Sequence, residues 1–534
     1  MEVAEGNGSD VVGERELAEA YDRVPYLGQP FRLSHPRLLS GLATLHGMSP
    51  ARPDECRVLE LGCGDGGNLI PMACSLPGSE FIGIDLSEGQ IERGRRCVSD
   101  LGITNVRLDA GSIADLTADA GQFDYVIAHG VYSWVQDSLK AKILEICSVN
   151  LAPEGMAYVS YNALPGWLFN RAMRDLMLFH TRDIVDSEAR VRAVLQLMEE
   201  LVDGTDDSTD AHHVALRYFS KRLRSHADLA GYISHEYMEV YNDAFYLRDF
   251  VGAAEARGLQ YVCDADHAMC HENRFPATAY AKAKEFSRDR LEVEQYLDFI
   301  RNTPFRRTLL CHGGLTLDSS YSFERIRTLF AGTDAELVES EPGASVVGFQ
   351  TDDGRRVGIG DPSARAALEH LCRARPATVP VETLIEAVSE AVSREDMSGP
   401  AQIRARIGHV LYSLWRSGLV DLFGAPRNCT GLVSEKPEGF GLARYQAAGR
   451  YVTTMAHRSI AMDDEVASLI LRHLDGTHDR EALLRILTDA LESGEIKLPP
   501  WKSETKPEPS AGDRLARLVD LNLDKMAEHA LLVG

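Results

Sequence analysis

The sequence contains no apolar run that approaches the ~20 residues needed to cross a bilayer. The segment Met1–Gly6 is acidic and lacks the basic start and apolar core of a signal peptide. Positive charge is also scarce, with 56 Lys and Arg against 80 Asp and Glu and a formal net charge of −24. Because phosphate contacts need a basic face, we expect no nucleic-acid partner. Because no apolar run is long enough, we also expect no membrane insertion.

Cysteine is sparse and scattered, with ten residues and no C-x-x-C pair. Most of these cysteines lie inside apolar runs, which is typical of reduced thiols in a cytoplasmic protein rather than of a disulfide framework. Only Cys263, Cys270 with His271, and Cys311 with His312 resemble metal-ligand groupings. Their spacing matches no standard zinc site, so we expect no metal.

The composition is otherwise that of a globular protein, with 44% hydrophobic and 25% charged residues. At 534 residues the chain is too long for one ordinary core, and we expect roughly two to four domains. No pattern in the sequence indicates an oligomeric state.

The most informative stretch is residues 57–68, a short apolar run followed at once by a glycine turn. The run predicts a buried strand. Gly62, Gly64 and Gly66 leave the following loop without side chains, so that a ligand can lie against bare backbone N–H groups. A helix that begins at Leu69 would direct its positive N-terminal end toward the same place.

Two carboxylates suggest which ligand this loop holds. Glu60 would orient a ligand amino group and repel a pyrophosphate. Asp85 follows a second apolar run, where an acid reaches the two hydroxyls of a ribose. The glycines also fit the dinucleotide spacing G-x-G-x-x-G, which alone is a weak signal. A nicotinamide or flavin site and a glycine turn without a ligand are the alternatives.

Strands and helices alternate after this loop, as a parallel α/β sheet demands. A helical stretch interrupts the alternation before two last strands. Since this stretch is far longer than an ordinary connection, it indicates an insertion near the ligand-binding edge of the sheet, with a lid or acceptor-binding role. The seven strands that we predict are 57–61, 80–86, 106–110, 123–128, 156–161, 259–263 and 305–312.

The remaining chain predicts two smaller units joined by a Gly- and Pro-rich linker at 424–441. Three helical runs with short strands make the first of them winged-helix-like. The domains that we predict are 1–35, an N-terminal segment that either covers the cofactor or packs on the domain surface; 36–164, the cofactor-binding core; 165–242, the helical insertion; 243–314, the completion of the sheet; 315–425, the winged-helix-like unit; and 426–534, a C-terminal helical unit.

The order Glu-x-Gly-x-Gly-x-Gly at 60–66 resembles motif I of class I S-adenosylmethionine-dependent methyltransferases, and Asp85 matches their ribose acid. The runs 129–135 and 164–167 resemble bacterial methyltransferases with a methyltransferase regulatory domain, among them the rickettsial-type protein lysine methyltransferases. Runs at 234–238 and 305–310 look like signatures of that regulatory region. The resemblance implies a Rossmann-like, seven-stranded class I methyltransferase sheet and S-adenosylmethionine as cofactor.

The expected site residues follow from the motifs and from this resemblance. Ser112 is a departure, because many class I enzymes carry an acid there for the adenine amino group. Expected cofactor-binding residues are Tyr21, Glu60, Gly62, Gly64, Gly66, Asn68, Asp85, Leu86, Gln90, Ser112, Ile113 and His129. The candidates for catalysis are His129, Tyr132 and Trp134, and those for substrate binding are Tyr132, Trp134, Tyr161 and Trp167.

Three of these candidates have more than one interpretation. His129 could contact the amino-acid end of the cofactor, abstract a proton, or hold a turn. Tyr132 and Trp134 could wall an acceptor channel and hold an ammonium by cation–π contact, or one of them could anchor its loop in the core.

Three hypotheses about function follow. The first is N-methylation of protein lysine by direct in-line transfer, which needs no obligatory base. The second is a small-molecule methyltransferase whose insertion closes as a lid. The third is a regulatory protein that binds the cofactor without turnover.

Overall fold

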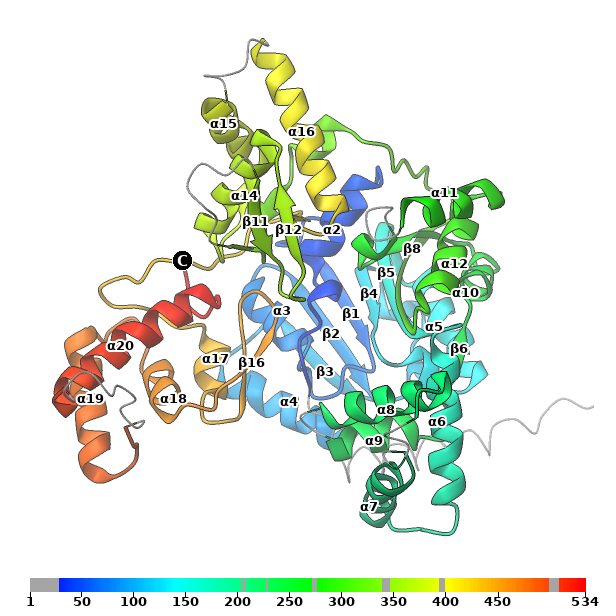
Figure 1. Ribbon diagram of the computed structural model, residues 1–534, viewed down its shortest axis with the longest axis horizontal. Helices are drawn as coiled ribbons and strands as arrows, with labels where there is room; N and C mark the ends of the chain where they lie inside the picture. Colours follow the sequence, from blue (N-terminus) through cyan, green and yellow to red (C-terminus); the bar gives the residue numbers. More distant parts are fainter. Residues whose placement is uncertain are drawn as a thin grey trace, which may run out of the picture.

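The computed structural model describes residues 28–534 except 203, 205–207, 227–228, 271–275, 339–345, 393–398 and 499–508. A central sheet is surrounded by three groups of elements (Figure 1). The helical insertion lies below the sheet in this view, the unit formed by residues 315–425 lies above it, and the C-terminal helices lie to the left.

The central sheet has the order β3-β2-β1-β4-β5-β8-β7, and β8 is antiparallel to both of its neighbours. A short strand, β6, pairs with the end of β5. Its strands are β1 (Arg57–Leu61), β2 (Glu80–Asp85), β3 (Val106–Ala110), β4 (Phe123–Ala128), β5 (Leu151–Ala163), β6 (Ala244–Phe245), β7 (Leu259–Asp264) and β8 (Phe305–His312). Apart from the short β6, this confirms the predicted seven-stranded Rossmann-like sheet, in which the last strand, β8, lies between β5 and β7.

Strand β5 starts earlier than we predicted. Phe123 pairs with Leu151 but Tyr125 pairs with Met156, so the residues between Leu151 and Met156 bulge out of the ladder. Residues 153–155 therefore form an irregularity inside the strand rather than a turn before it.

Alternate side chains of the strands enter two different cores. Val58 and Tyr125 belong to the cluster that continues into the C-terminal half, whereas Leu59 and Val126 belong to a second cluster. This division follows from the period of two along a strand. The helices that complete the two layers are α2 (Pro36–Leu45), α3 (Leu69–Ser75), α4 (Glu88–Asp100), α5 (Asp137–Val149), α10 (Leu247–Glu255), α11 (Ala277–Phe286) and α12 (Arg290–Arg301).

The insertion consists of α6 (Trp167–His180), α7 (Ser187–Leu197), α8 (Ala211–Arg224) and α9 (Leu229–Tyr237), within the range predicted for it. It has a small core of its own, in which Met177, Val194, Phe219 and Ile233 are buried. Helices α8 and α9 lie next to the lower end of the sheet (Figure 1), which brings the insertion close to the loops that follow β1 to β4.

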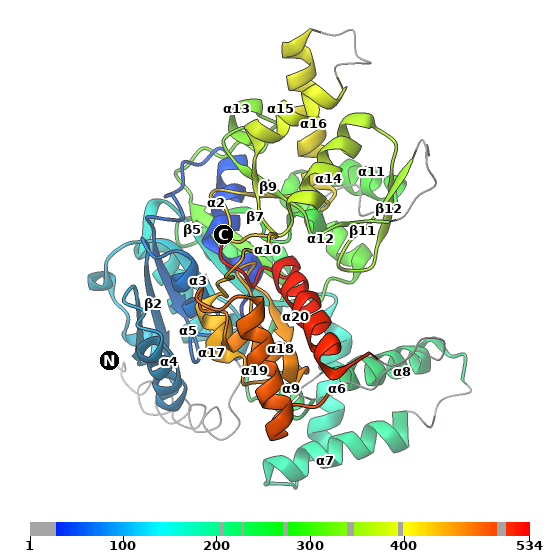
Figure 2. The ribbon, with the colours of Figure 1, turned by 90° about the vertical axis from the view of Figure 1, so that its left-hand side faces the viewer.

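The chain after the sheet forms two units, both with helices and short strands (Figure 2). The first contains α13 (Phe323–Ile326), α14 (Pro362–Ala374), α15 (Val381–Val392), α16 (Pro400–Arg416), β9 (Phe330–Gly332), β10 (Glu336–Leu337), β11 (Val347–Gln350), β12 (Arg356–Ile359), β13 (Val379–Pro380) and β14 (Asp421–Phe423). The second contains α17 (Gly441–Gln446), α18 (Glu465–Arg472), α19 (Arg480–Ser493), α20 (Ala511–Glu528), β15 (Tyr451–Thr453) and β16 (Ser459–Ala461).

The segment 424–441, which we predicted as a linker, packs against other parts of the chain. Its first residue donates a backbone hydrogen bond to Arg37 of α2 at 2.8 Å. Cys429 and Gly439 form bridges with Val533 and Leu532 at the end of the chain. Glycine and proline are frequent here because the backbone turns closely against other backbone, and not because the segment is a free spacer.

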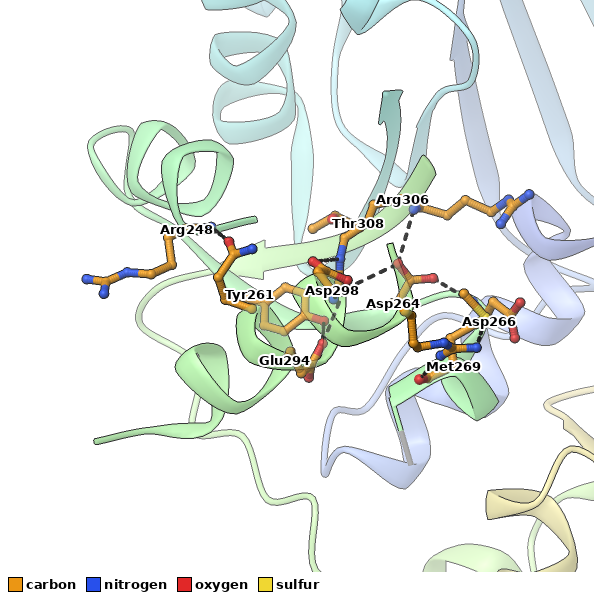
Figure 3. A network of polar contacts seen from close by, with 12 residues as sticks. Arg248, Tyr261, Asp264, Asp266, Met269, Glu294, Asp298, Arg306 and Thr308 are labelled. Carbon is orange, nitrogen blue, oxygen red and sulfur yellow. Dashed lines mark hydrogen bonds and ion pairs between the residues drawn. The ribbon is translucent and has the colours of Figure 1, made fainter. Parts of the chain in front are cut away.

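Strand β8 is held by a buried ionic cluster (Figure 3). The guanidinium of Arg306 donates to both oxygens of Asp298 at 2.9 Å and to Glu294 at 3.2 Å, and lies 3.5 Å from Asp264. One cation therefore faces three buried carboxylates. Burial raises the pKa of Asp298, and it raises that of Asp264 to about 6.

Among the described residues, none of the helices combines the length and the hydropathy that a membrane crossing requires. In the same part of the chain, no group of three or more His, Cys, Asp or Glu side chains is arranged to hold a metal ion.

Candidate active site

The loop after β1 approaches its neighbours so closely that it needs glycine. Gly62, Gly64 and Gly66 have φ values of 71°, 56° and 78°, which side chains other than glycine rarely adopt. A Cβ atom on Gly62 would come within 2.4 Å of Val131, and one on Gly64 within 3.1 Å of the Gln90 amide oxygen. The backbone N–H groups of Gly62 and Cys63 donate to the carbonyl of Ile84, which fastens the loop to β2.

A cavity of about 300 Å³ lies beside this loop, a volume within the range of small-molecule sites. It opens where β1, β2, β3 and β4 end, at the edge where open α/β sheets bind ligands. The structure brings eleven of the predicted site residues to its wall: Glu60, Gly62, Gly64, Asn68, Asp85, Leu86, Gln90, Ser112, Ile113, His129 and Trp134.

Asp85 is held firmly at the end of β2. One carboxylate oxygen accepts the backbone N–H of Gly64 at 2.8 Å, and the other accepts that of Ser87 at 2.9 Å. Ser87 in turn caps α4 by accepting from the backbone N–H of Gln90. Since each carboxylate oxygen has a second lone pair, Asp85 can also accept from two neighbouring hydroxyl groups.

Glu60 is a buried carboxylate with one satisfied oxygen. Its Oε1 accepts from the side-chain amide of Asn68 at 2.7 Å, whereas its Oε2 is buried and has no hydrogen-bond partner within the described part of the chain. Burial, with a smaller contribution from the charge of Asp85, raises its pKa to about 8, against the effect of the hydrogen bond from Asn68. A ligand cation would supply the missing partner and offset the cost of the buried charge.

The N-terminal segment closes over the glycine loop. Gly28, Gln29 and Phe31 line the cavity, and a Cβ atom on Gly67 would lie only 2.3 Å from the backbone of Gly28. The backbone N–H of Phe31 donates to Asn68 at 2.8 Å. Tyr21, which we expected at the cofactor, lies outside the described residues.

His129 forms part of the wall rather than a free base. Its Nδ1 is 2.9 Å from the hydroxyl of Tyr158, and its ring lies 3.6 Å from that of Phe31. Burial, together with the charge of Arg307, lowers its pKa to about 3. A histidine with so low a pKa is neutral at pH 7 and is a weak general base.

The four aromatic candidates divide between the cavity and the interior. Trp134 lines the cavity. Tyr132 is 4% exposed and packs against the rings of Phe245 and Phe250, at 5.1–5.3 Å. Tyr132 therefore anchors the loop after β4 in the core instead of facing a ligand.

Tyr161 and Trp167 are likewise turned away from the cavity. Tyr161 stacks on Phe250 at 4.2 Å, and its hydroxyl is 2.9 Å from that of Thr308. Trp167 donates its indole N–H to Asn242 at 2.9 Å. Gly66 is also absent from the wall, because its Cα faces Ile70 and Leu108.

Two residues of the insertion reach the cavity and were not among our candidates. His235 and Glu236 come from α9 and line the wall together with Trp134. Burial raises the pKa of Glu236 to about 7, opposed by the charge of Arg222. The run 234–238 resembles a signature of the regulatory region, but its pattern does not indicate that it faces the ligand.

A second cavity, of about 1010 Å³, adjoins the first. Gln29, Phe31, His129 and Phe305 line both of them. The far walls of the larger cavity come from the two C-terminal units, and they include Asp334, Glu336, Arg458 and Glu528. The rings of Phe31, His129 and Phe305 thus lie between the two cavities, and a bulky ligand in the larger cavity would lie next to a ligand in the smaller cavity.

Comparison with known proteins identifies the family. A methyltransferase domain matches residues 53–214, a predicted methyltransferase regulatory domain matches 230–312, and a PKMT C-terminal winged helix domain matches 435–531. An uncharacterised protein of Rickettsia prowazekii is 38% identical over 240 residues, which cover 45% of this chain and 94% of that protein. The chain belongs to the methyltransferases that carry this regulatory domain.

Two longer matches extend over nearly the whole methyltransferase. Another Rickettsia prowazekii protein is 29% identical over 536 residues, covering 99% of this chain and 95% of that protein. The structure of PKMT2 from Rickettsia typhi in complex with AdoHcy has 28% sequence identity and a TM-score of 0.83, and the match covers 96% of this chain and 100% of that chain.

The matched winged helix domain, residues 435–531, falls in the unit that we predicted only as helical, and the winged-helix-like unit at 315–425 stays a prediction. Both units combine helices with short strands, so their sequence patterns are similar. The hairpin of β15 and β16 belongs to the matched range, and it pairs from Tyr451 to Ala461.

The cofactor of this enzyme is S-adenosylmethionine, and the cavity is suited to it. The unpartnered oxygen of Glu60 fits an ammonium group, and the glycine cradle leaves backbone open beside it. Asp85 lies across the loop with both oxygens fixed in position.

Proposed function

We propose that this enzyme methylates the side-chain amine of lysine in protein substrates. The observation that carries the proposal is the carboxylate of Glu236, which the insertion places on the wall of the cofactor cavity. Burial raises its pKa to about 7, against the charge of Arg222. A cationic amine is the group that such a carboxylate attracts most strongly.

The cofactor is assigned to the cavity by the polar groups of its wall. Glu60 binds the amino group of its methionine end, with Asn68 holding the carboxylate in place. Asp85 accepts from the ribose hydroxyls, and Leu86 and Ile113 enclose the adenine. The backbone at Gly62 and Gly64 lies along the ligand, with Gln90 and Ser112 at the rim and His129 closing the side that faces the second cavity.

S-adenosylmethionine supplies a methyl group on a positively charged sulfur. In the transfer, the lysine nitrogen forms a bond to this carbon while the carbon–sulfur bond breaks and its electron pair stays on sulfur. The amine must lose one proton for this reaction, and desolvation in the cavity lowers its pKa. Glu236, with a pKa near 7, receives the ammonium, orients it and can accept the proton.

The size of the second cavity favours a protein over a free amino acid. At about 1010 Å³ it can hold several residues of an extended segment, whose lysine would reach past Phe31, His129 and Phe305. The similarity to PKMT2 of Rickettsia typhi and the match to a PKMT winged helix domain agree with the resemblance to protein lysine methyltransferases. We therefore assign the larger cavity to the protein substrate.

The test combines labelling with one substitution. The enzyme is incubated with a bacterial lysate and methyl-labelled cofactor, and labelled protein is digested and searched for methyl-lysine by mass spectrometry. Methyl-lysine supports the proposal. Label only in small molecules supports a biosynthetic enzyme, no label supports a cofactor-binding regulator, and either result contradicts the proposal.

Glu236→Gln removes the charge with little change in shape. We expect kcat/KM for the labelled protein to fall about tenfold or more, because a charge-assisted hydrogen bond contributes roughly 1.5–3 kcal/mol. The affinity for S-adenosylhomocysteine should stay within about twofold. Glu255→Gln, on the exposed face of α10, is the matched control. Equal activity of the two variants would remove Glu236 from the acceptor site.

A further inference from the structure

The turn between β15 and β16 reaches from the winged-helix unit to the cofactor cavity. Its His457 lies with Nε2 at 2.8 Å from the side-chain oxygen of Asn68, although the two residues are 389 positions apart. His457 is 4% exposed. Its φ of 58° is unusual for a residue other than glycine and directs the turn toward the glycine loop.

The hydrogen bonds around Asn68 define which atom donates. The backbone N–H of Phe31 donates to Oδ1 at 2.8 Å, so this atom is an acceptor. The amide Nδ2 then donates to Glu60 at 2.7 Å and to Ser34 at 3.1 Å. His457 must therefore donate its Nε2–H to the same oxygen as Phe31. Burial lowers the pKa of His457 to about 3, which keeps the ring neutral with one N–H.

The turn itself is fixed in position. His457 N–H donates to the carbonyl of Thr454 at 2.9 Å, and Met455 N–H donates to the carbonyl of Ala530, just after α20. The neighbouring Arg458 forms ion pairs with Asp334 and Asp352 of the preceding unit. A rigid turn can hold the orientation of a side chain that it contacts.

We propose that His457 is a positioning residue for the cofactor, acting through Asn68 on Glu60. By holding the amide of Asn68 in one orientation, it keeps the Glu60 carboxylate aimed at the amino group of the ligand. Cofactor affinity in the first domain thus depends on a turn of the winged-helix unit. The inference rests on the cofactor placement given under Proposed function, and it predicts an effect confined to ligands that have the amino-acid end.

The test compares two ligands on the full-length protein. S-adenosylhomocysteine has the amino-acid end, whereas 5′-methylthioadenosine lacks it. His457→Asn suits a positive φ but is too short to reach Asn68. We expect calorimetry to show about three- to tenfold weaker binding of S-adenosylhomocysteine, the value of one hydrogen bond, and binding of methylthioadenosine within about twofold of wild type.

Two further variants sharpen the result. His457→Gln keeps an N–H donor at a similar reach and should retain more S-adenosylhomocysteine affinity than His457→Asn. His478→Asn, at a histidine that contacts Asp475 in the same unit, should change neither affinity. Equal losses for both ligands in His457→Asn would show a merely structural role, and no loss would show no role. Either result overturns the inference.

The same ligands separate this inference from the cofactor placement. If Glu60→Gln weakens only S-adenosylhomocysteine while His457→Asn has no effect, the placement stands and the role of His457 fails. If Glu60→Gln weakens both ligands equally, the amino group is not at Glu60, and both fail.

Discussion

Binding of the cofactor should release a proton from Glu60. The carboxylate is buried, has one oxygen without a partner in the described part of the chain, and has a pKa raised to about 8. At pH 7 it is therefore about nine-tenths protonated. A bound ammonium group favours the ionised form, so Glu60 must lose its proton when the ligand binds. About one proton per ligand should leave the site at pH 7.

The release sets the direction and size of the pH dependence. Affinity for S-adenosylhomocysteine should rise up to about tenfold per pH unit from pH 6 and level off near pH 8. Glu60→Gln should remove this slope. Measured at pH 8.5, the variant should bind about 10- to 100-fold more weakly than wild type, because it loses a charge-assisted hydrogen bond worth roughly 1.5–3 kcal/mol.

Titration calorimetry at pH 7 in two buffers of different ionisation enthalpy measures the proton number directly. A value near zero for wild type, or the same pH slope in Glu60→Gln, would refute the reasoning. The folding stability of the ligand-free protein should depend on pH in the opposite direction to the affinity. Its folded-state pKa lies above the ordinary value of 4.5, so stability from this group is present below pH 4.5 and is lost as pH rises to 8. Glu60→Gln should lack this decline in the midpoint of thermal unfolding.

Two further predictions concern binding and stability. Asp85→Ala should abolish calorimetrically detectable binding of S-adenosylhomocysteine, since the carboxylate also holds the glycine loop; unchanged affinity would contradict the drawn pocket. Arg306→Leu should lower stability by about 3–5 kcal/mol, because it leaves Asp264 and Asp298 buried without their cation, while Glu294 keeps its ion pair with Arg290. The loss, seen as a lower unfolding temperature, should be smaller at pH 5 than at pH 8, because the raised pKa of Asp264 lets it protonate; equal losses at both pH values would speak against this cluster.

The sheet could be predicted because its strands are buried on both faces. Continuous apolar runs mark β1, β2 and β4, and the alternation at 305–312 marked β8 with the bounds that the structure has. The alternating glycines at 62, 64 and 66 indicated the ligand loop. Their positive φ values explain why the sequence needs glycine at these positions. Local pattern was sufficient wherever a residue's role depends on its own element.

The remaining features depend on contacts between distant elements. Tyr132 and Trp134 are two positions apart in one turn, and only tertiary packing determines that the first enters the core and the second lines the cavity. Glu236 is an ordinary helix residue until α9 is placed against the sheet. His457 carries no motif, and its contact with Asn68 spans most of the chain. Single-sequence periodicity contains no information on such contacts.

The strand order has a consequence for synthesis on the ribosome. Strand β5 pairs with β8 over residues 157–162, but β8 follows only after the whole insertion has been made. Until Phe305–His312 emerges, most of this edge of β5 has no neighbour, and its backbone N–H and C=O groups are unpaired. Open edges of this kind attract strands of other chains. A nascent chain stalled before residue 305 should therefore be prone to aggregate, whereas eight more residues are enough to close the sheet.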